Sequence, residues 1–150
     1  MSRFTDTSFL YALYIPQSNS VRATTYCHGM KEVLVVSSLL LFEFRQSIRL
    51  QVFRHREDPT QGFPKQAGDK ALRALAGNLE VGALVLTSVD WADVHDRAER
   101  LSANHTSTEG HRALDVLHVA TALHLDAKEF LTFDGRQKKL AQAEGLKVPL

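Results

Sequence analysis

Short apolar segments alternate along the chain with longer segments of mixed apolar and polar residues. The apolar segments predict strands at residues 3–6, 32–37, 83–87, 129–133 and 146–150. The longer segments predict helices at residues 7–15, 20–30, 39–55, 69–79, 91–103, 114–125 and 135–144. Residues 57–68, which hold two prolines and two glycines, and the polar residues 104–110 predict loops. Strands separated by helices favour an α/β domain with a mostly parallel central sheet.

Length and composition indicate a soluble protein in which residues 1–150 form a single domain. One domain usually takes about 100–200 residues, and a chain with 44% hydrophobic and 23% charged residues is not intrinsically disordered. The net charge of +1 excludes a polycationic nucleic-acid coat, so an RNA site would depend on a local arrangement of charge. The single cysteine excludes an intramolecular disulfide. No apolar run reaches the roughly 18 residues of a membrane span, so we expect a cytoplasmic protein.

Two aspartates follow predicted strands directly. Asp6 ends the first strand segment, and Asp134 follows the strand segment at 129–133. The carboxyl ends of parallel strands lie along one edge of a sheet, where α/β folds form ligand sites, so these two side chains can approach each other. The alternative for each is an ordinary helix N-cap, because aspartate is among the residues preferred there.

Two further acids lie within apolar helical sequence. Glu43 follows a run of leucines and a phenylalanine, and Asp115 lies among alanine, leucine and valine residues. A buried ionised carboxylate costs several kcal/mol unless it is paired or binds a metal. The alternatives are an acid on the helix surface or a pair with a neighbouring arginine, for which Arg45 and Arg112 are close enough in sequence.

Together, the four acids predict a metal site. Four converging carboxylates without a counter-charge would repel one another, and a divalent cation removes this conflict. Oxygen ligands suit Mg²⁺ or Mn²⁺ rather than zinc. Such a site can polarise a phosphodiester and activate water for its hydrolysis. The hypothesis is therefore a phosphodiesterase site at Asp6, Glu43, Asp115 and Asp134.

The same acids lie in four motifs that follow one another along nearly the whole chain. The motifs are Asp6-Thr7-Ser8-Phe9-Leu10, residues 37–43 ending at Glu43, residues 112–122 around Asp115, and Leu131-Thr132-Phe133-Asp134. In this order they resemble the PIN-domain ribonucleases, most closely the VapC-type toxins of bacterial toxin–antitoxin pairs.

The resemblance implies a three-layer α/β/α sandwich around a parallel sheet of about five strands. It also implies a metal-dependent endoribonuclease that forms a homodimer and is neutralised by a small antitoxin. By the same resemblance the four acids would be catalytic and hold Mg²⁺ or Mn²⁺, and Thr132 and Ser8 would support the site through hydrogen bonds.

RNA would also require positive charge near the acids, because contacts to the phosphate backbone supply most non-specific affinity. Arg112 precedes Asp115 by about one helical turn, and Arg136 follows Asp134 closely, so these two arginines are the candidate phosphate contacts. The alternative for both is a solvated helix face.

Two other functions remain open. One is a PIN-like protein that binds RNA or a partner without cleaving it. The other is a phosphatase of the haloacid dehalogenase type, which also keeps an aspartate at the end of its first strand. That family would require a second aspartate two residues later, where this chain has Ser8.

Overall fold

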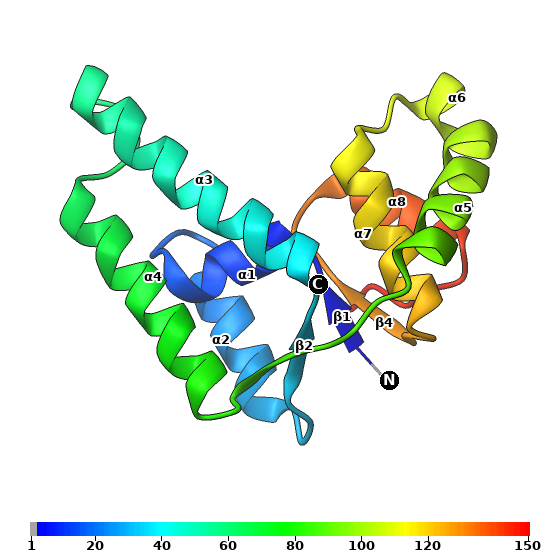
Figure 1. The fold of residues 1–150 in the computed structure, drawn as a ribbon, viewed down its shortest axis with the longest axis horizontal. Helices are drawn as coiled ribbons and strands as arrows, with labels where there is room; N and C mark the ends of the chain where they lie inside the picture. The colour runs from blue at the N-terminus through cyan, green and yellow to red at the C-terminus, as the bar shows by residue number, and fades with distance from the viewer. Residues whose placement is uncertain (1–2) are drawn as a thin grey trace. The chain divides into compact units, whose positions relative to one another are not determined.

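The computed structural model describes residues 3–150, and it divides the chain into two compact units (Figure 1). The terminal unit comprises Met1–Phe9 and Thr87–Leu150, and the central unit comprises Leu10–Leu86. Each unit contains one pair of parallel strands together with helices. The mixed α/β class with parallel strand pairing is therefore confirmed.

In the terminal unit, a buried strand pair lies beside three helices. Strand β1 (Arg3–Thr5) pairs in parallel with β4 (Glu129–Leu131), so that Phe4 lies opposite Phe130 and both side chains are buried. The longer helices of this unit are α5 (Trp91–Leu101), α7 (Ala113–His124) and α8 (Gly135–Ala143). Helix α7 packs against α5, α8 and β1, and this packing buries most of its residues.

The predicted loop at residues 104–110 is wrong, because most of this segment is helical. Helix α5 continues into a π-helical turn η1 (Ser102–Thr106) and a short helix α6 (Ser107–Glu109). The segment ends at Gly110, whose φ of 73° is left-handed and whose N–H bonds to the Thr106 carbonyl at 2.8 Å. Polar composition suggested a loop, but polar side chains do not prevent backbone hydrogen bonds from continuing a helix.

In the central unit, β2 (Leu34–Val36) pairs in parallel with β3 (Leu84–Leu86). The helices of this unit are most of α1 (Thr7–Tyr14), α2 (Ser20–Gly29), α3 (Ser38–Glu57) and α4 (Lys65–Glu80). Ser37 caps α3, because its hydroxyl oxygen accepts the Leu40 N–H at 3.1 Å. The two long helices α3 and α4 lie side by side (Figure 1).

The predicted loop at residues 57–68 is too long. Helix α3 extends to Glu57, and α4 already begins at Lys65, directly after Pro64. Gly68, which suggested a loop, lies inside α4. A Cβ atom there would come within 2.6 Å of the Val52 Cγ2 atom on α3. The glycine therefore allows the two helices to approach closely and does not mark a turn.

The predicted last strand at residues 146–150 is also wrong. Only Lys147 pairs with the sheet, through an isolated parallel bridge to Glu129. The Phe130 N–H donates to the Lys147 carbonyl at 2.8 Å, and the Lys147 N–H donates to the Lys128 carbonyl at 3.0 Å. Pro149 provides no N–H for further pairing. Among residues 3–150, no helix is long and apolar enough to cross a membrane.

Candidate functional site

Asp6 lies at the carboxyl end of β1 and is completely buried. Its carboxylate accepts hydrogen bonds from two hydroxyl groups, from Ser8 Oγ at 2.7 Å and from Thr132 Oγ1 at 2.6 Å. The Phe9 N–H donates to Oδ1 at 3.0 Å, and Gln137 Nε2 donates to Oδ2 at 2.9 Å. The pairing of β1 with β4 brings these donors from opposite ends of the chain to one carboxylate.

Burial dominates the protonation of this group. Loss of solvent raises the pKa of Asp6 from 3.8 to about 6, although its hydrogen bonds with Thr132, Phe9 and Ser8 act in the opposite direction. An electrostatic interaction with His118, a buried residue of α7, also lowers the pKa of Asp6. Asp6 is thus a carboxylate that the fold keeps out of water and surrounds with donors.

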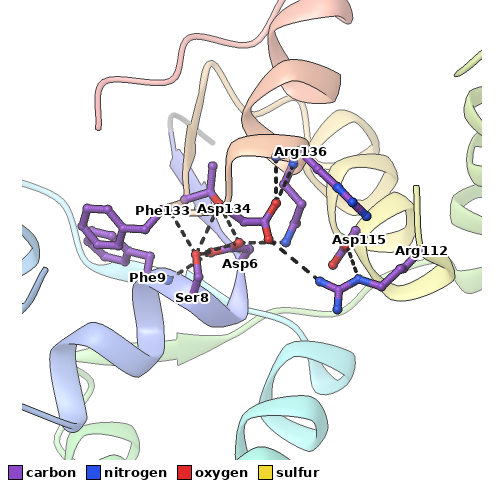
Figure 2. Close-up of polar contacts among 10 residues, drawn as sticks. Asp6, Ser8, Phe9, Arg112, Asp115, Phe133, Asp134 and Arg136 are labelled. Carbon is purple, nitrogen blue, oxygen red and sulfur yellow. Dashed lines mark hydrogen bonds and ion pairs between the residues drawn. The ribbon is translucent and has the colours of Figure 1, made fainter. Parts of the chain in front are cut away.

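Ser8 and Thr132 connect Asp6 to the segment after β4. The hydroxyl oxygen of Ser8 accepts the Phe133 N–H at 2.9 Å, and that of Thr132 accepts the Asp134 N–H at 2.9 Å. Figure 2 shows Ser8 between Asp6 and Phe133. The two predicted supporting residues therefore hold the ends of β1 and β4 together.

Asp134 lies at the start of α8 and caps this helix. Its Oδ1 atom accepts the N–H groups of Arg136 at 2.9 Å and Gln137 at 3.0 Å. The second oxygen, Oδ2, faces the guanidinium of Arg112 across 3.8 Å. The ordinary N-cap, one of the sequence alternatives, is therefore present at Asp134, and its role in a metal site stays a prediction.

Asp115 lies in the first turn of α7 and is 4% exposed. Its Oδ2 atom accepts a hydrogen bond from Arg112 Nε at 3.0 Å, and the Arg112 side chain is 71% exposed. Arg112 therefore pairs with both Asp115 and Asp134, and Figure 2 shows its guanidinium linked to each carboxylate. The pairing with a neighbouring arginine, one of the sequence alternatives, is present.

Gln137 is a site residue that the sequence reasoning missed. It is 4% exposed, and its amide nitrogen donates to Asp6. In the described part of the chain, its buried Oε1 atom has no hydrogen-bond partner. The D-x-x-Q spacing of residues 134–137 indicates the start of a helix, but it does not predict a contact with Asp6.

Comparisons with known proteins show the family of this chain. Residues 3–143 match the PIN domain family. The chain belongs to the PIN domain family. The match spans parts of both units, so the terminal unit with its carboxylates and the central unit are each PIN sequence. The comparison with curated proteins gives no significant match.

Two solved structures are similar to this PIN chain over almost its full length. One is VapC20 of Mycobacterium tuberculosis, described as a sarcin-ricin loop cleaving toxin, with 19% identity, a TM-score of 0.68, and coverage of 98% of both chains. The other is FitAcB of Neisseria gonorrhoeae, with 17% identity, a TM-score of 0.61, and coverage of 97% of this chain and 95% of the other. At these identities, the similarity concerns the fold.

The remaining predicted residues of this PIN chain lie as follows. Glu43 is half-buried on α3 in the central unit, whereas the three aspartates lie in the terminal unit. Its convergence with them stays a prediction. Arg136 is exposed in the first turn of α8, beside Asp134 (Figure 2).

The donor chemistry of the PIN carboxylates fits a hard divalent cation. Every candidate ligand is a carboxylate oxygen, as Mg²⁺ and Mn²⁺ prefer. The Arg112 guanidinium already places a positive charge against both Asp115 and Asp134. Within residues 3–150, no three His, Cys, Asp or Glu side chains are drawn together closely enough to hold a metal. The carboxylates are thus of the right chemical type for Mg²⁺ or Mn²⁺, but they are not close enough together to coordinate one ion as they lie.

Proposed function

We propose that this PIN protein is a metal-dependent endoribonuclease and the toxin of a toxin–antitoxin pair. The observation that carries the proposal is that one arginine, Arg112, pairs with Asp115 and Asp134 in the same unit that holds the buried Asp6. Asp6 comes from the end of β1, Asp134 from the segment after β4, and Asp115 from α7. The chain belongs to the PIN family. This membership supports nucleic-acid hydrolysis over the alternative of a haloacid-dehalogenase-type phosphatase.

In this proposal Asp6, Glu43, Asp115 and Asp134 hold Mg²⁺ or Mn²⁺. The bound ion would stabilise the charge that develops on the phosphate and supply an activated water for its hydrolysis. Each carboxylate has a different local role. Asp134 is held by the α8 backbone, and Asp115 is buried by the packing of α7.

The residues around Asp6 would keep its carboxylate in position. The hydroxyls of Ser8 and Thr132 bind it and are themselves fixed by backbone N–H groups of the segment after β4. A preorganised carboxylate needs no rearrangement during the reaction. One carboxylate of the site would also accept the proton of the attacking water.

Arg112 and Arg136 are the proposed contacts to the RNA backbone. Both side chains are exposed and lie beside the aspartates (Figure 2). An arginine fork matches a phosphate group with two parallel hydrogen bonds. The phosphodiester would thus be held next to the carboxylates.

The proposed partners are RNA, a small antitoxin and a second copy of the chain. The proposed location is the cytoplasm. The solved relative from Mycobacterium tuberculosis is described as cleaving the sarcin-ricin loop. A hairpin with that loop is therefore a suitable first substrate.

The deciding experiment incubates this hairpin and total cellular RNA with the purified protein and maps the cleaved ends. We expect cleavage with Mg²⁺ or Mn²⁺, none with EDTA, and a loss of about a hundredfold or more in Asp115→Asn, because a proposed metal ligand is lost. RNA that is bound but stays intact with either ion would instead establish the non-cleaving protein. Co-purification of a small protein expressed from the neighbouring gene tests the antitoxin.

A further inference from the structure

Arg112 makes two ion pairs with carboxylates that come from different elements. Its Nε atom lies 3.0 Å from Oδ2 of Asp115, and one of its terminal nitrogens lies 3.8 Å from Oδ2 of Asp134. The Asp115 side chain is 6% exposed and that of Asp134 is 29% exposed. A single guanidinium thus neutralises two acids that would otherwise repel each other (Figure 2).

A divalent cation at this position would compete directly with Arg112. It would bind the same two carboxylates, and its charge would repel the guanidinium a few ångströms away. Both cations cannot occupy the gap between Asp115 and Asp134. Metal binding therefore requires the arginine to leave.

The departure of Arg112 would be inexpensive. Its side chain is 71% exposed, so most of it is already in contact with solvent. The ion pair with Asp134 is partly exposed and contributes only about 0.2–1 kcal/mol. Beside the buried Asp115, the charge of the metal would replace that of the guanidinium. The displaced guanidinium would remain beside the site, because its backbone directly precedes α7.

We infer that Arg112 is an internal counter-ion that couples metal binding to RNA binding. Without metal it neutralises Asp115 and Asp134, and with metal it is released to bind a phosphate of the RNA. Because coupling between two ligands is reciprocal, RNA should also strengthen metal binding by the same factor. This inference rests on the proposed function and adds that metal binding prepares the site for RNA binding.

The test measures Mn²⁺ binding by calorimetry in the wild type, in Arg112→Gln and in Arg97→Gln. Arg97 is the matched control, because its Nε makes a comparable contact of 2.6 Å with Asp93, which is not a proposed metal ligand. We expect Arg112→Gln to bind Mn²⁺ about twofold to tenfold more tightly than the wild type, since nothing has to be displaced. Arg97→Gln should bind like the wild type.

The second measurement is the affinity for a labelled phosphorothioate RNA, checked to be intact, with and without Mn²⁺. In the wild type and Arg97→Gln, Mn²⁺ should raise RNA affinity severalfold, and in Arg112→Gln most of this gain should be lost. Equal Mn²⁺ affinity in all three proteins would overturn the counter-ion role. A wild type that binds no Mn²⁺ at all would overturn the metal-dependent nuclease as well, so the two failures are distinguishable.

Spectroscopy of the wild type covers the case in which Arg112→Gln fails to fold. The Nε–H signal of Arg112, held by Asp115, should shift or broaden when diamagnetic Mg²⁺ is added. The Nε–H signal of Arg97 should stay unchanged. An Arg112 signal that is indifferent to saturating Mg²⁺ would also overturn the inference.

Discussion

At the scale of single residues, Asp6 combines a structural and a chemical role. It accepts the Phe9 N–H, as a helix cap does, and it also forms the buried centre of the candidate site. Sequence reasoning could place Asp6 and Asp134 at one sheet edge, because both follow strand segments. It could not reveal Gln137, whose contact with Asp6 spans 131 positions and depends on how α8 packs.

The raised pKa of Asp6 makes stability depend on pH when metal is absent. The folded protein keeps this proton up to about pH 6, whereas the unfolded chain releases it near 3.8. The resulting stabilisation is therefore complete below about pH 4 and is lost as the pH rises through about 6. Urea unfolding in EDTA should show the wild type losing up to roughly 3 kcal/mol relative to Asp6→Asn between pH 4 and pH 7. A constant difference between the two proteins would contradict the shift.

Thr132 is a second residue whose hydroxyl serves two neighbours. It donates to Asp6 at 2.6 Å and accepts the Asp134 N–H at 2.9 Å, in a buried environment. Thr132→Val keeps the shape, removes one of the donors to Asp6 and leaves the Asp134 N–H without its acceptor. We therefore expect a loss of about 1–3 kcal/mol in the free energy of unfolding.

The matched control for this change is Thr60→Val. The Thr60 hydroxyl also donates to an aspartate, Asp58, at 2.8 Å, but it is exposed to solvent. Water can replace that bond, so the expected change stays within about 0.5 kcal/mol. Equal losses in the two variants would show that the burial of Thr132 does not matter.

At the scale of elements, the sequence predicted β1 to β4 and the long helices, but it added a last strand that does not form and misjudged several boundaries. The run of β-branched residues around β2 identified a buried strand, and the spacing in α7 identified a helix. Glycine and polar residues led to wrong loop predictions at Gly68 and at residues 104–110. A glycine indicates a loop only when close packing does not call for it, and polar residues also occur on exposed helices. At Gly68 the requirement is close packing, which appears only once α3 and α4 are in place.

Two glycines of α4 should therefore respond to alanine in opposite directions. At Gly68 a Cβ would meet Val52 Cγ2 at 2.6 Å and Ile48 Cγ2 at 3.3 Å, and branched side chains on a helix have little freedom to move. We expect Gly68→Ala to lower the free energy of unfolding by about 1–3 kcal/mol.

At Gly77 no atom lies within 4 Å of the added Cβ. Gly77→Ala should therefore stabilise the protein by up to about 1 kcal/mol. Thermal unfolding of both variants gives the sign, and stabilisation by Gly68→Ala would refute the packing role.

At the scale of the whole molecule, the site depends on contacts between distant parts of the chain. Asp6 and Thr132 are 126 positions apart, and the parallel pairing of β1 with β4 joins them. The rule that parallel strands end at one edge made this closure predictable from the sequence. The bridging position of Arg112 was not predictable, because its spacing from Asp115 indicated one partner and the second comes from the start of α8.

The last prediction concerns Glu43, the proposed fourth metal ligand. Its motif in the sequence suggests this role, and it lies in the central unit. A ligand at a hundred times its dissociation constant stabilises the folded state by about 2.7 kcal/mol, or about 5–10 °C in the unfolding midpoint for a chain of this length. Saturating Mn²⁺ should produce this shift in the wild type and less than half of it, at the same concentration, in Glu43→Gln. Glu57→Gln is the control, because Glu57 is an exposed acid of the same helix that pairs with Arg56. If Glu43→Gln shifts as far as the wild type, the aspartates bind the metal without Glu43, and the four-carboxylate site reduces to three.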